Sequence, residues 1–272
     1  MPSISLKNVL TLTTVILFFV LTIWWGISFF IVKSDSQNLI WAASYQIVAL
    51  WGGMLGLLVI SRLWGGTKSV MGQAVISFAV GLLLEVFGQS VFSFYNIILK
   101  INIPYPSVAD VGFFGSIPFY IYGIILLGKA SRVSMSLRSF ASKLQTVLIP
   151  LAMLSLSYVS FLKNYEIDLS QKTRIFFDFG YPVGQAIYVS IALLVYILSR
   201  NILGGIMRKK VLLILAALAI QYIADYTFLY QNLKGTWING GYGDFIYLLA
   251  YFFMSLGLVR LVGIFDADNE SE

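Results

Sequence analysis

The sequence predicts an all-α fold, a polytopic membrane helix bundle of about eight transmembrane helices with internal hairpin repeats. Of its 272 residues, 59% are hydrophobic and only 11% are charged, whereas a soluble domain carries about a quarter charged residues. The apolar residues form long runs, and runs of about 20 such residues are typical of membrane spans. No segment between the runs approaches the roughly 50 residues of a soluble domain, so we expect a single membrane domain.

Eight apolar segments follow one another along the chain, and each is long enough to cross a bilayer. They are Val9–Val32, Leu39–Leu63, Val70–Leu99, Val111–Leu127, Leu144–Leu162, Ile175–Leu198, Val211–Tyr230 and Phe245–Phe265. The first segment is longer than a signal-peptide core and no A-x-A-like site follows it, so we expect a retained span. Residues 1–265 are therefore predicted to form the membrane domain, and residues 266–272 an acidic cytoplasmic tail.

The Lys and Arg residues near the span ends predict the orientation, because the side that holds more of them is cytoplasmic. The side of the N-terminus holds twelve of the 18, namely Lys7, Arg62, Lys68, Lys129, Arg132, Arg138, Lys143, Arg200, Arg208, Lys209, Lys210 and Arg260. The other side holds Lys33, Lys100, Lys163, Lys172, Arg174 and Lys234. This split predicts that both ends of the chain are cytoplasmic. It also accounts for the net charge of +6 without a nucleic-acid partner.

The chain contains no cysteine and no histidine, which narrows the chemistry that it can perform. Disulfides and thiol chemistry are excluded, and both the commonest metal ligand and the usual general base are missing. We therefore expect no catalytic residue, no metal and no cofactor. A membrane enzyme that acts on lipid is the least favoured functional class for the same reason.

Two acidic residues, Glu85 and Asp225, lie well inside predicted spans. An ionisable group there costs about 2.5–3.5 kcal/mol on insertion scales and usually faces the protein interior. No Lys or Arg lies deep in any span to pair with them, so we expect at least one to be protonated. A glutamine one helical turn away in each span offers a purely structural hydrogen bond as the alternative. The candidate ligand or proton site comprises Glu85, Gln89, Gln221, Tyr222, Asp225 and Tyr226.

Polar residues also stand where spans begin on the side away from the N-terminus. Ser107 and Asp110 have the spacing of a capping box, with Asp in the acidic position. Asp244 opens the last span and Asp178 lies near the start of the sixth. Carboxylates suit the positive end of a helix, so we interpret all four as helix caps at the mouth of an outer cavity.

The third and fourth spans resemble the seventh and eighth. Asp110 and Asp244 each open a span, and a glycine follows each of them thirteen residues later. The preceding spans each carry an acid and a glutamine one turn apart, in opposite order. The matched positions are Glu85 with Gln221, Gln89 with Asp225, Asp110 with Asp244, and Gly123 with Gly257. We predict two hairpins related by an axis along the membrane normal, with chance similarity of aromatic-rich spans as the alternative.

Tyrosine and glycine add two weaker signals. Most of the 16 tyrosines lie in the outer halves of the spans, which is typical of an interfacial belt or of an aromatic-lined pocket. The tyrosines in question are Tyr95, Tyr105, Tyr158, Tyr165, Tyr181, Tyr226, Tyr230, Tyr242 and Tyr247. The pairs Gly52–Gly56 and Gly180–Gly184 have the G-x-x-x-G spacing that permits close helix contact.

Two segments carry a family resemblance. They are Pro106-Ser107-Val108-Ala109-Asp110-Val111-Gly112-Phe113-Phe114 and Gly243-Asp244-Phe245-Ile246-Tyr247-Leu248-Leu249-Ala250-Tyr251. Over roughly residues 81–261 the chain resembles the multi-span membrane domain found N-terminal to GGDEF-type diguanylate cyclases and some histidine kinases. The resemblance implies a sensory or regulatory domain. It departs from the family in that no cyclase or kinase domain follows Phe265. The chain is also similar to stand-alone bacterial membrane proteins that share this core.

The resemblance implies a multi-pass protein of the bacterial inner membrane, and the split of Lys and Arg residues predicts its N-in, C-in orientation. We expect a stand-alone sensory or ligand-binding domain that takes a small or lipidic ligand in its outer half and signals through a separate partner. The alternative is a small proton-coupled transporter that uses Glu85 and Asp225. Apart from the lipid bilayer, a ligand and a signalling protein, no partner is expected.

Overall fold

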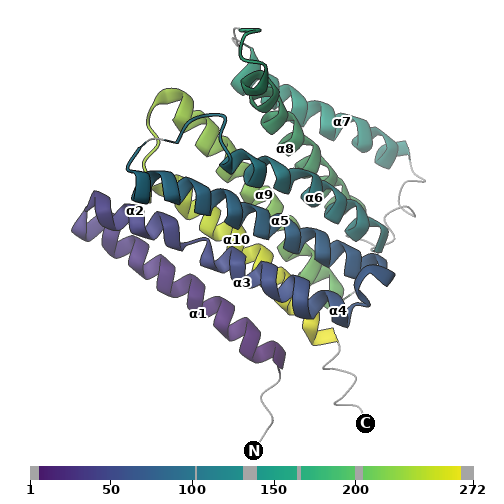
Figure 1. Ribbon diagram of the computed structural model, residues 1–272. Coiled ribbons are helices and arrows are strands. Elements are labelled where there is room, and N and C mark those ends of the chain that lie inside the picture. Colours follow the sequence, from purple (N-terminus) through teal and green to yellow (C-terminus); the bar gives the residue numbers. More distant parts are fainter. Residues whose placement is uncertain (1–5, 102, 131–139, 164–166, 200–204, 265–272) are drawn as a thin grey trace, which may run out of the picture.

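The computed structural model describes residues 6–101, 103–130, 140–163, 167–199 and 205–264, and within these ranges every regular element is a helix (Figure 1). Eight helical segments are long and apolar enough to cross a membrane, which confirms the predicted all-α, eight-span architecture. The predicted acidic tail lies outside the described residues.

The helices follow the predicted order. Their bounds are α1 Leu6–Gly26, α2 Asp35–Ser44, α3 Ile47–Leu55, α4 Ser61–Leu63, α5 Val70–Ser93, α6 Ala109–Ala130, α7 Phe140–Ser157, α8 Lys172–Ser199, α9 Gly205–Lys234 and α10 Tyr242–Arg260. The second span is divided into α2, α3 and α4, with a π-helical stretch at Gly56–Ile60. Further π-helical stretches end three other spans, at Ile27–Val32, Phe94–Leu99 and Tyr158–Leu162.

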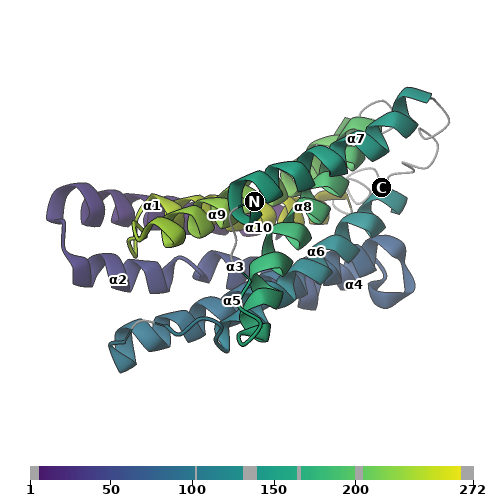
Figure 2. The ribbon, with the colours of Figure 1, turned by 90° about the horizontal axis from the view of Figure 1, so that it is seen from above.

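The bundle has a well-packed centre and two thinly covered margins. In the most apolar stretch of α10, 61% of the residues are buried, against 6% in α7 and 17% in α1. Figure 1 shows α1 at one margin and α7 at the other, and the view from above places α5 and α6 on the side of the bundle opposite α9 (Figure 2). Because α10 packs against α1, α3 and α9, it is the element best placed to connect different parts of the core.

Helices that run in the same direction begin at the same end of the bundle. We call the end where α1 begins and α10 ends the termini end, and the other the opposite end. Both α6 and α10 begin at the opposite end (Figure 1), so Asp110 and Asp244 lie at the same face. This agrees with the predicted parallel relation of the two hairpins.

Both G-x-x-x-G pairs lie at close helix contacts. A Cβ added at Gly52 would lie 2.0 Å from the Ser255 Oγ of α10, and one at Gly56 would meet α5. Gly180 and Gly184 of α8 face side chains of α6 in the same way. A larger residue at any of these positions would push two helices apart. The G-x-x-x-G spacing therefore marks contacts between helices of the same chain.

The two hairpins also share a contact at their matched glycines. A Cβ at Gly123 of α6 would lie 2.9 Å from the ring of Phe78 of α5. A Cβ at Gly257 of α10 would lie 2.8 Å from Ile214 of α9. Phe78 and Ile214 are separated by the same number of residues as Glu85 and Gln221, so corresponding positions make corresponding contacts. This supports the internal repeat, whose superposition stays a prediction.

Candidate functional site

The capping box before α6 forms, and it is tied to a second helix. The backbone N–H of Ser107 donates to Asp110 Oδ2 at 2.7 Å, and the Ser107 Oγ accepts from the N–H of Ala109 at 3.2 Å. The other carboxyl oxygen of Asp110 accepts from the Tyr181 hydroxyl of α8 at 2.8 Å. Asp110 is therefore both a cap and a link between α6 and α8.

The last span begins in a comparable way. Asp244 lies in the first turn of α10, is buried, and accepts from the backbone N–H of Gly240 at 2.6 Å. The Tyr45 hydroxyl, from the junction of α2 and α3, supplies a further hydrogen bond. This cap thus also connects two spans through a tyrosine.

The prediction that Asp178 caps a helix is wrong. The helix begins at Lys172, so Asp178 lies in its second turn, where backbone N–H groups already have partners within the helix. Its carboxylate instead accepts from the Tyr105 hydroxyl at 2.9 Å and forms an ion pair with Arg174 at 3.6 Å. Burial and the neighbouring Asp178 carboxylate raise the pKa of Tyr105 well above its ordinary value of 10.0, so this hydroxyl stays a donor.

Glu85 lies at the centre of the bundle, where three helices meet. Its side chain is 4% exposed. Oε1 accepts from the Ser116 hydroxyl of α6 at 2.6 Å, and Oε2 accepts from the Tyr251 hydroxyl of α10 at 3.2 Å. Glu85 therefore faces the interior of the bundle, as predicted.

Asp225 is held by hydroxyl donors in the same manner, but it is less deeply covered. Oδ1 accepts from the Tyr247 hydroxyl of α10 at 2.8 Å and from the Gln221 amide at 3.2 Å. Oδ2 accepts from the Tyr188 hydroxyl of α8 at 3.2 Å. Asp225 is half-buried, whereas Gln221 is buried. The carboxyl group thus joins α9 to two further helices.

The two glutamines behave differently. Gln221 bonds to the acid on its own helix, so it does not supply the hydrogen bond between helices that was the structural alternative. The Gln89 amide instead donates to the backbone carbonyl of Ala42 in α2 at 2.9 Å. Gln89 therefore forms a structural hydrogen bond between helices, while hydroxyl groups of α6 and α10 occupy the carboxyl oxygens of Glu85.

Tyr222 and Tyr226 turn toward α7. Their rings pack at 4.1 Å between centroids, and the Tyr226 hydroxyl pairs with the Ser157 hydroxyl of α7. The tyrosines that bond to Asp225 are Tyr188 and Tyr247. The prediction that Tyr222 and Tyr226 line a pocket around Asp225 therefore has no support in these hydrogen bonds.

A tyrosine hydroxyl reaches each of the five carboxyl groups described above. The pairs are Tyr251 with Glu85, Tyr181 with Asp110, Tyr105 with Asp178, Tyr188 and Tyr247 with Asp225, and Tyr45 with Asp244. Sequence reasoning assigned Tyr181 and Tyr247 to a belt or pocket and passed over Ser116, Tyr45, Tyr188 and Tyr251. One available signal was the one-turn spacing of Tyr247 and Tyr251, inside the segment that carries the family resemblance.

The belt interpretation fits other tyrosines. Tyr158, Tyr230 and Tyr242 lie near span ends and are exposed, as expected of side chains at a membrane interface. Tyr165 lies outside the described residues.

The network around Glu85 and Asp225 suits proton or cation exchange. Neither carboxyl has a Lys or Arg within ion-pair distance in the described part of the chain. The two groups lie within electrostatic range of each other, and each is surrounded by O–H donors. Among the same residues no three acidic side chains gather as metal ligands. A carboxylate accepts hydrogen bonds only, whereas a protonated carboxyl also donates, so a change of charge must rearrange these hydroxyls.

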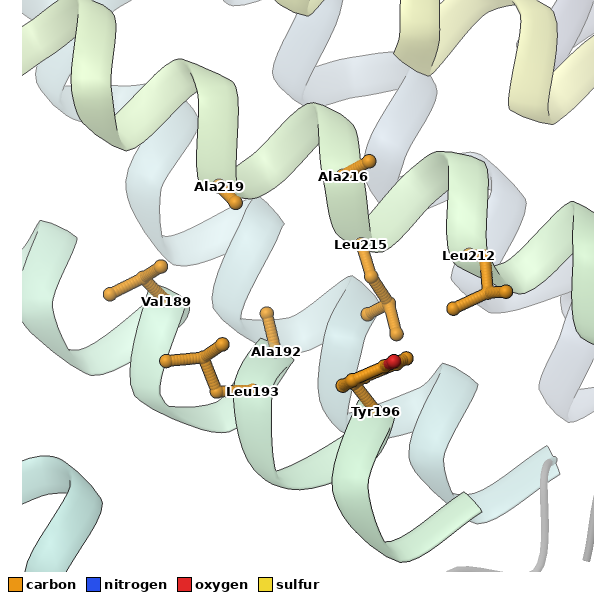
Figure 3. Close-up of a pocket in the computed structure, with 8 residues that line it drawn as sticks. All are labelled: Val189, Ala192, Leu193, Tyr196, Leu212, Leu215, Ala216 and Ala219. Carbon is orange, nitrogen blue, oxygen red and sulfur yellow. The ribbon is translucent and has the colours of Figure 1, made fainter. Parts of the chain in front are cut away.

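A groove of about 210 Å³ lies between α8 and α9, away from the hydrogen bonds of Glu85 and Asp225 (Figure 3). Its lining is apolar apart from one tyrosine, and comprises Val189, Ala192, Leu193, Tyr196, Leu212, Leu215, Ala216 and Ala219. On α9 these residues all precede Gln221, so the groove lies toward the termini end from Asp225. It differs from the aromatic pocket that was predicted near the opposite end.

Comparison with protein families, with curated proteins and with solved structures yields no match to this chain. The functional argument therefore rests on the acid–tyrosine network, by which we mean Glu85, Ser116, Tyr188, Gln221, Asp225, Tyr247 and Tyr251.

Proposed function

We propose that the protein is a membrane sensory domain in which the acid–tyrosine network responds to a proton or a small ligand and transmits the change through α10. The observation that carries this proposal is the placing of Tyr247 and Tyr251. They stand one turn apart on α10 and donate to carboxyl groups that come from two different helices.

The shared helix supplies a route for a signal. Any change of charge or occupancy at Glu85 alters what Tyr251 can donate to, and the same holds for Asp225 and Tyr247. Because both tyrosines belong to α10, either event favours a different position of that helix. A signal needs a two-state element that its ligand can bias, and we propose that α10 is this element because it receives both tyrosine–carboxyl contacts. The C-terminal end of α10 lies at the termini end of the bundle, where a separate signalling protein would bind.

Hydrogen exchange of α10 tests the proposal. The intact chain in lipid nanodiscs is compared between pH 5 and pH 8, alongside Glu85→Gln and Asp225→Asn. We expect the protection factors of the peptide over Tyr242–Arg260, which are exchange rates relative to the intrinsic rate at the same pH, to depend on pH in the parent chain and to lose most of that dependence in both variants. A peptide from the margin helix α1 is the internal control. Equal pH dependence in all three proteins would contradict the proposal.

A proton-coupled transporter remains the second candidate, and one observation favours it. Glu85 and Asp225 have no basic partner among the described residues, which leaves them available to carry a proton. Proteoliposomes with an internal pH dye separate the two functions. A sensor should leave an imposed pH gradient intact, whereas a transporter should dissipate it when its substrate is added and should fail to do so in Glu85→Gln and Asp225→Asn.

A further inference from the structure

Three basic side chains from three different helices gather at the termini end. Lys7 belongs to the first turn of α1, Lys210 lies near the start of α9, and Arg260 ends α10. Lys7 and Arg260 both lie within electrostatic range of the Lys210 ammonium. None of the three forms an ion pair with an acidic residue in the part of the chain that the structure describes. Like charges repel, so this grouping is unfavourable without an anion.

Lys210 is the unusual member of this group. Its side chain is 5% exposed, and its Nζ has no hydrogen-bond partner among the described residues. A buried ammonium is costly unless an anion or acceptor satisfies it. The neighbouring Lys209 is exposed to solvent, as is usual for lysine. An unsatisfied buried cation beside two others therefore indicates a place for an anion.

The depth of the group indicates which anion. Lys209 begins the seventh apolar span and Arg260 ends the eighth, so all three cations stand at the level where a helix leaves the hydrocarbon. Phospholipid phosphates lie at this level, and basic pockets between transmembrane helices on the cytoplasmic side are typical binding sites for anionic headgroups. The termini end is also the end with the larger number of Lys and Arg residues.

We propose that Lys7, Lys210 and Arg260 bind the phosphate of an anionic phospholipid between the termini ends of α1, α9 and α10. Lys210 supplies a buried, charge-assisted hydrogen bond, and Lys7 and Arg260 supply charge from the sides. This site is separate from the acid–tyrosine network and does not depend on the sensory function.

Native mass spectrometry of the full chain tests the site, with phosphatidylglycerol and phosphatidylcholine as the probes. We expect phosphatidylglycerol to bind about tenfold more tightly, and Lys210→Gln to remove about that factor, which is the value of a charge-assisted hydrogen bond. The matched control is Lys209→Gln, one residue earlier on the same helix, which should change affinity less than about twofold. Equal effects of the two substitutions, or no preference between the lipids, would overturn the proposal.

Two further arms identify the source of the anion. Inorganic phosphate at millimolar concentration should not compete with phosphatidylglycerol; full competition would assign the site to a soluble anion and overturn the lipid proposal. Neutralising the tail with Asp266→Asn, Asp268→Asn, Glu270→Gln and Glu272→Gln should leave lipid affinity equal or higher. If that change instead lowers Tm as much as Lys210→Gln does, and lipid has no effect, the tail is the partner and the proposal fails.

Two variants keep the test informative if Lys210→Gln does not fold. Lys210→Arg retains the positive charge and should keep the preference for phosphatidylglycerol. Lys7→Gln changes a half-buried residue in the first turn of a margin helix, and should weaken phosphatidylglycerol binding without loss of the fold. Unchanged binding in Lys7→Gln together with lost binding in Lys210→Arg would contradict the proposed role of charge.

Discussion

The Glu85 site and the Asp225 site are built from the same parts but enclosed to different extents. Each carboxyl group lies on the first helix of a hairpin and accepts from a tyrosine of α10. Glu85 is 4% exposed and receives one hydroxyl from each of two other helices. Asp225 is half-buried and receives one of its hydrogen bonds from Gln221 of its own helix.

This difference in burial leads us to expect that the two carboxyl groups contribute differently to stability and to proton exchange. When a fully enclosed carboxyl group is removed, no water replaces it, and its hydrogen-bond donors stay buried without a partner. A half-buried group is less tightly enclosed by the chain, so fewer surrounding atoms must move when it gains or loses a proton. We therefore infer that Glu85 contributes more to the stability of the bundle, whereas Asp225 is the better entry point for a proton or ligand into the shared network.

Removal of each carboxyl group tests that division. We expect Glu85→Ala to lower the free energy of unfolding by about 3 kcal/mol, because it creates a cavity and leaves the Tyr251 hydroxyl buried without a partner. Asp225→Ala should cost about 1.5 kcal/mol, since the shorter and only half-buried side chain leaves a smaller cavity. Denaturant titration in detergent micelles measures both. Equal losses, or a larger loss at Asp225, would show that burial does not distinguish the two sites.

The matched glycines test whether the two hairpins are true counterparts. Gly123→Ala and Gly257→Ala should each cost about 2 kcal/mol, because each new methyl group would press on the neighbouring helix of its own hairpin. Gly115→Ala in α6 is the control, since its Cβ would meet Leu84 at an ordinary 3.7 Å. That substitution should be neutral or stabilise by up to about 1 kcal/mol. Thermal unfolding curves for all three would reveal a mismatch between the hairpins.

The sequence was sufficient for those features that depend on local chemistry. Hydropathy located eight spans, because a bilayer requires long apolar helices. The Ser107–Asp110 cap was predictable because its partners lie within three residues. The inward position of Glu85 followed from the cost of charge in hydrocarbon.

Features that depend on how separate helices meet could not be predicted from the sequence. Gln89 bonds to Ala42 and not to Glu85, because α2 approaches α5 at that level. Asp178 does not act as a cap because the helix begins at the polar Lys172, three residues before the predicted start at Ile175, which places Asp178 in the second turn. The tyrosine partners of Glu85 and Asp225 come from other spans, and their register on α10 is set by packing.

Double substitution on α10 tests whether the two sites act together. Tyr251→Phe and Tyr247→Phe should each cost about 1 kcal/mol, the usual value of one hydrogen bond. If α10 couples the sites, the double variant should depart from additivity by at least about 0.5 kcal/mol. Tyr242→Phe is the control, because that side chain is 55% exposed at the start of the same helix. Strict additivity would mean that the two sites are independent.

The outer pair Tyr105–Asp178 offers the mildest test of the tyrosine–carboxyl pattern, because it lies at the opposite end and is partly exposed. Tyr105→Phe should lower the free energy of unfolding by well under 1 kcal/mol at pH 7, as exposed polar pairs generally do.

The contribution of Tyr105 to stability should decrease at alkaline pH. The pKa of Tyr105 is raised in the folded chain, so the fold favours the protonated hydroxyl. That contribution is fully present below about pH 10, the ordinary value of tyrosine, and is lost as the pH rises above it. The parent chain should therefore lose stability above pH 10 more steeply than Tyr105→Phe, with Tyr242→Phe as the reference for an exposed tyrosine. Parallel curves for the parent and Tyr105→Phe would show that Asp178 does not hold the hydroxyl in solution.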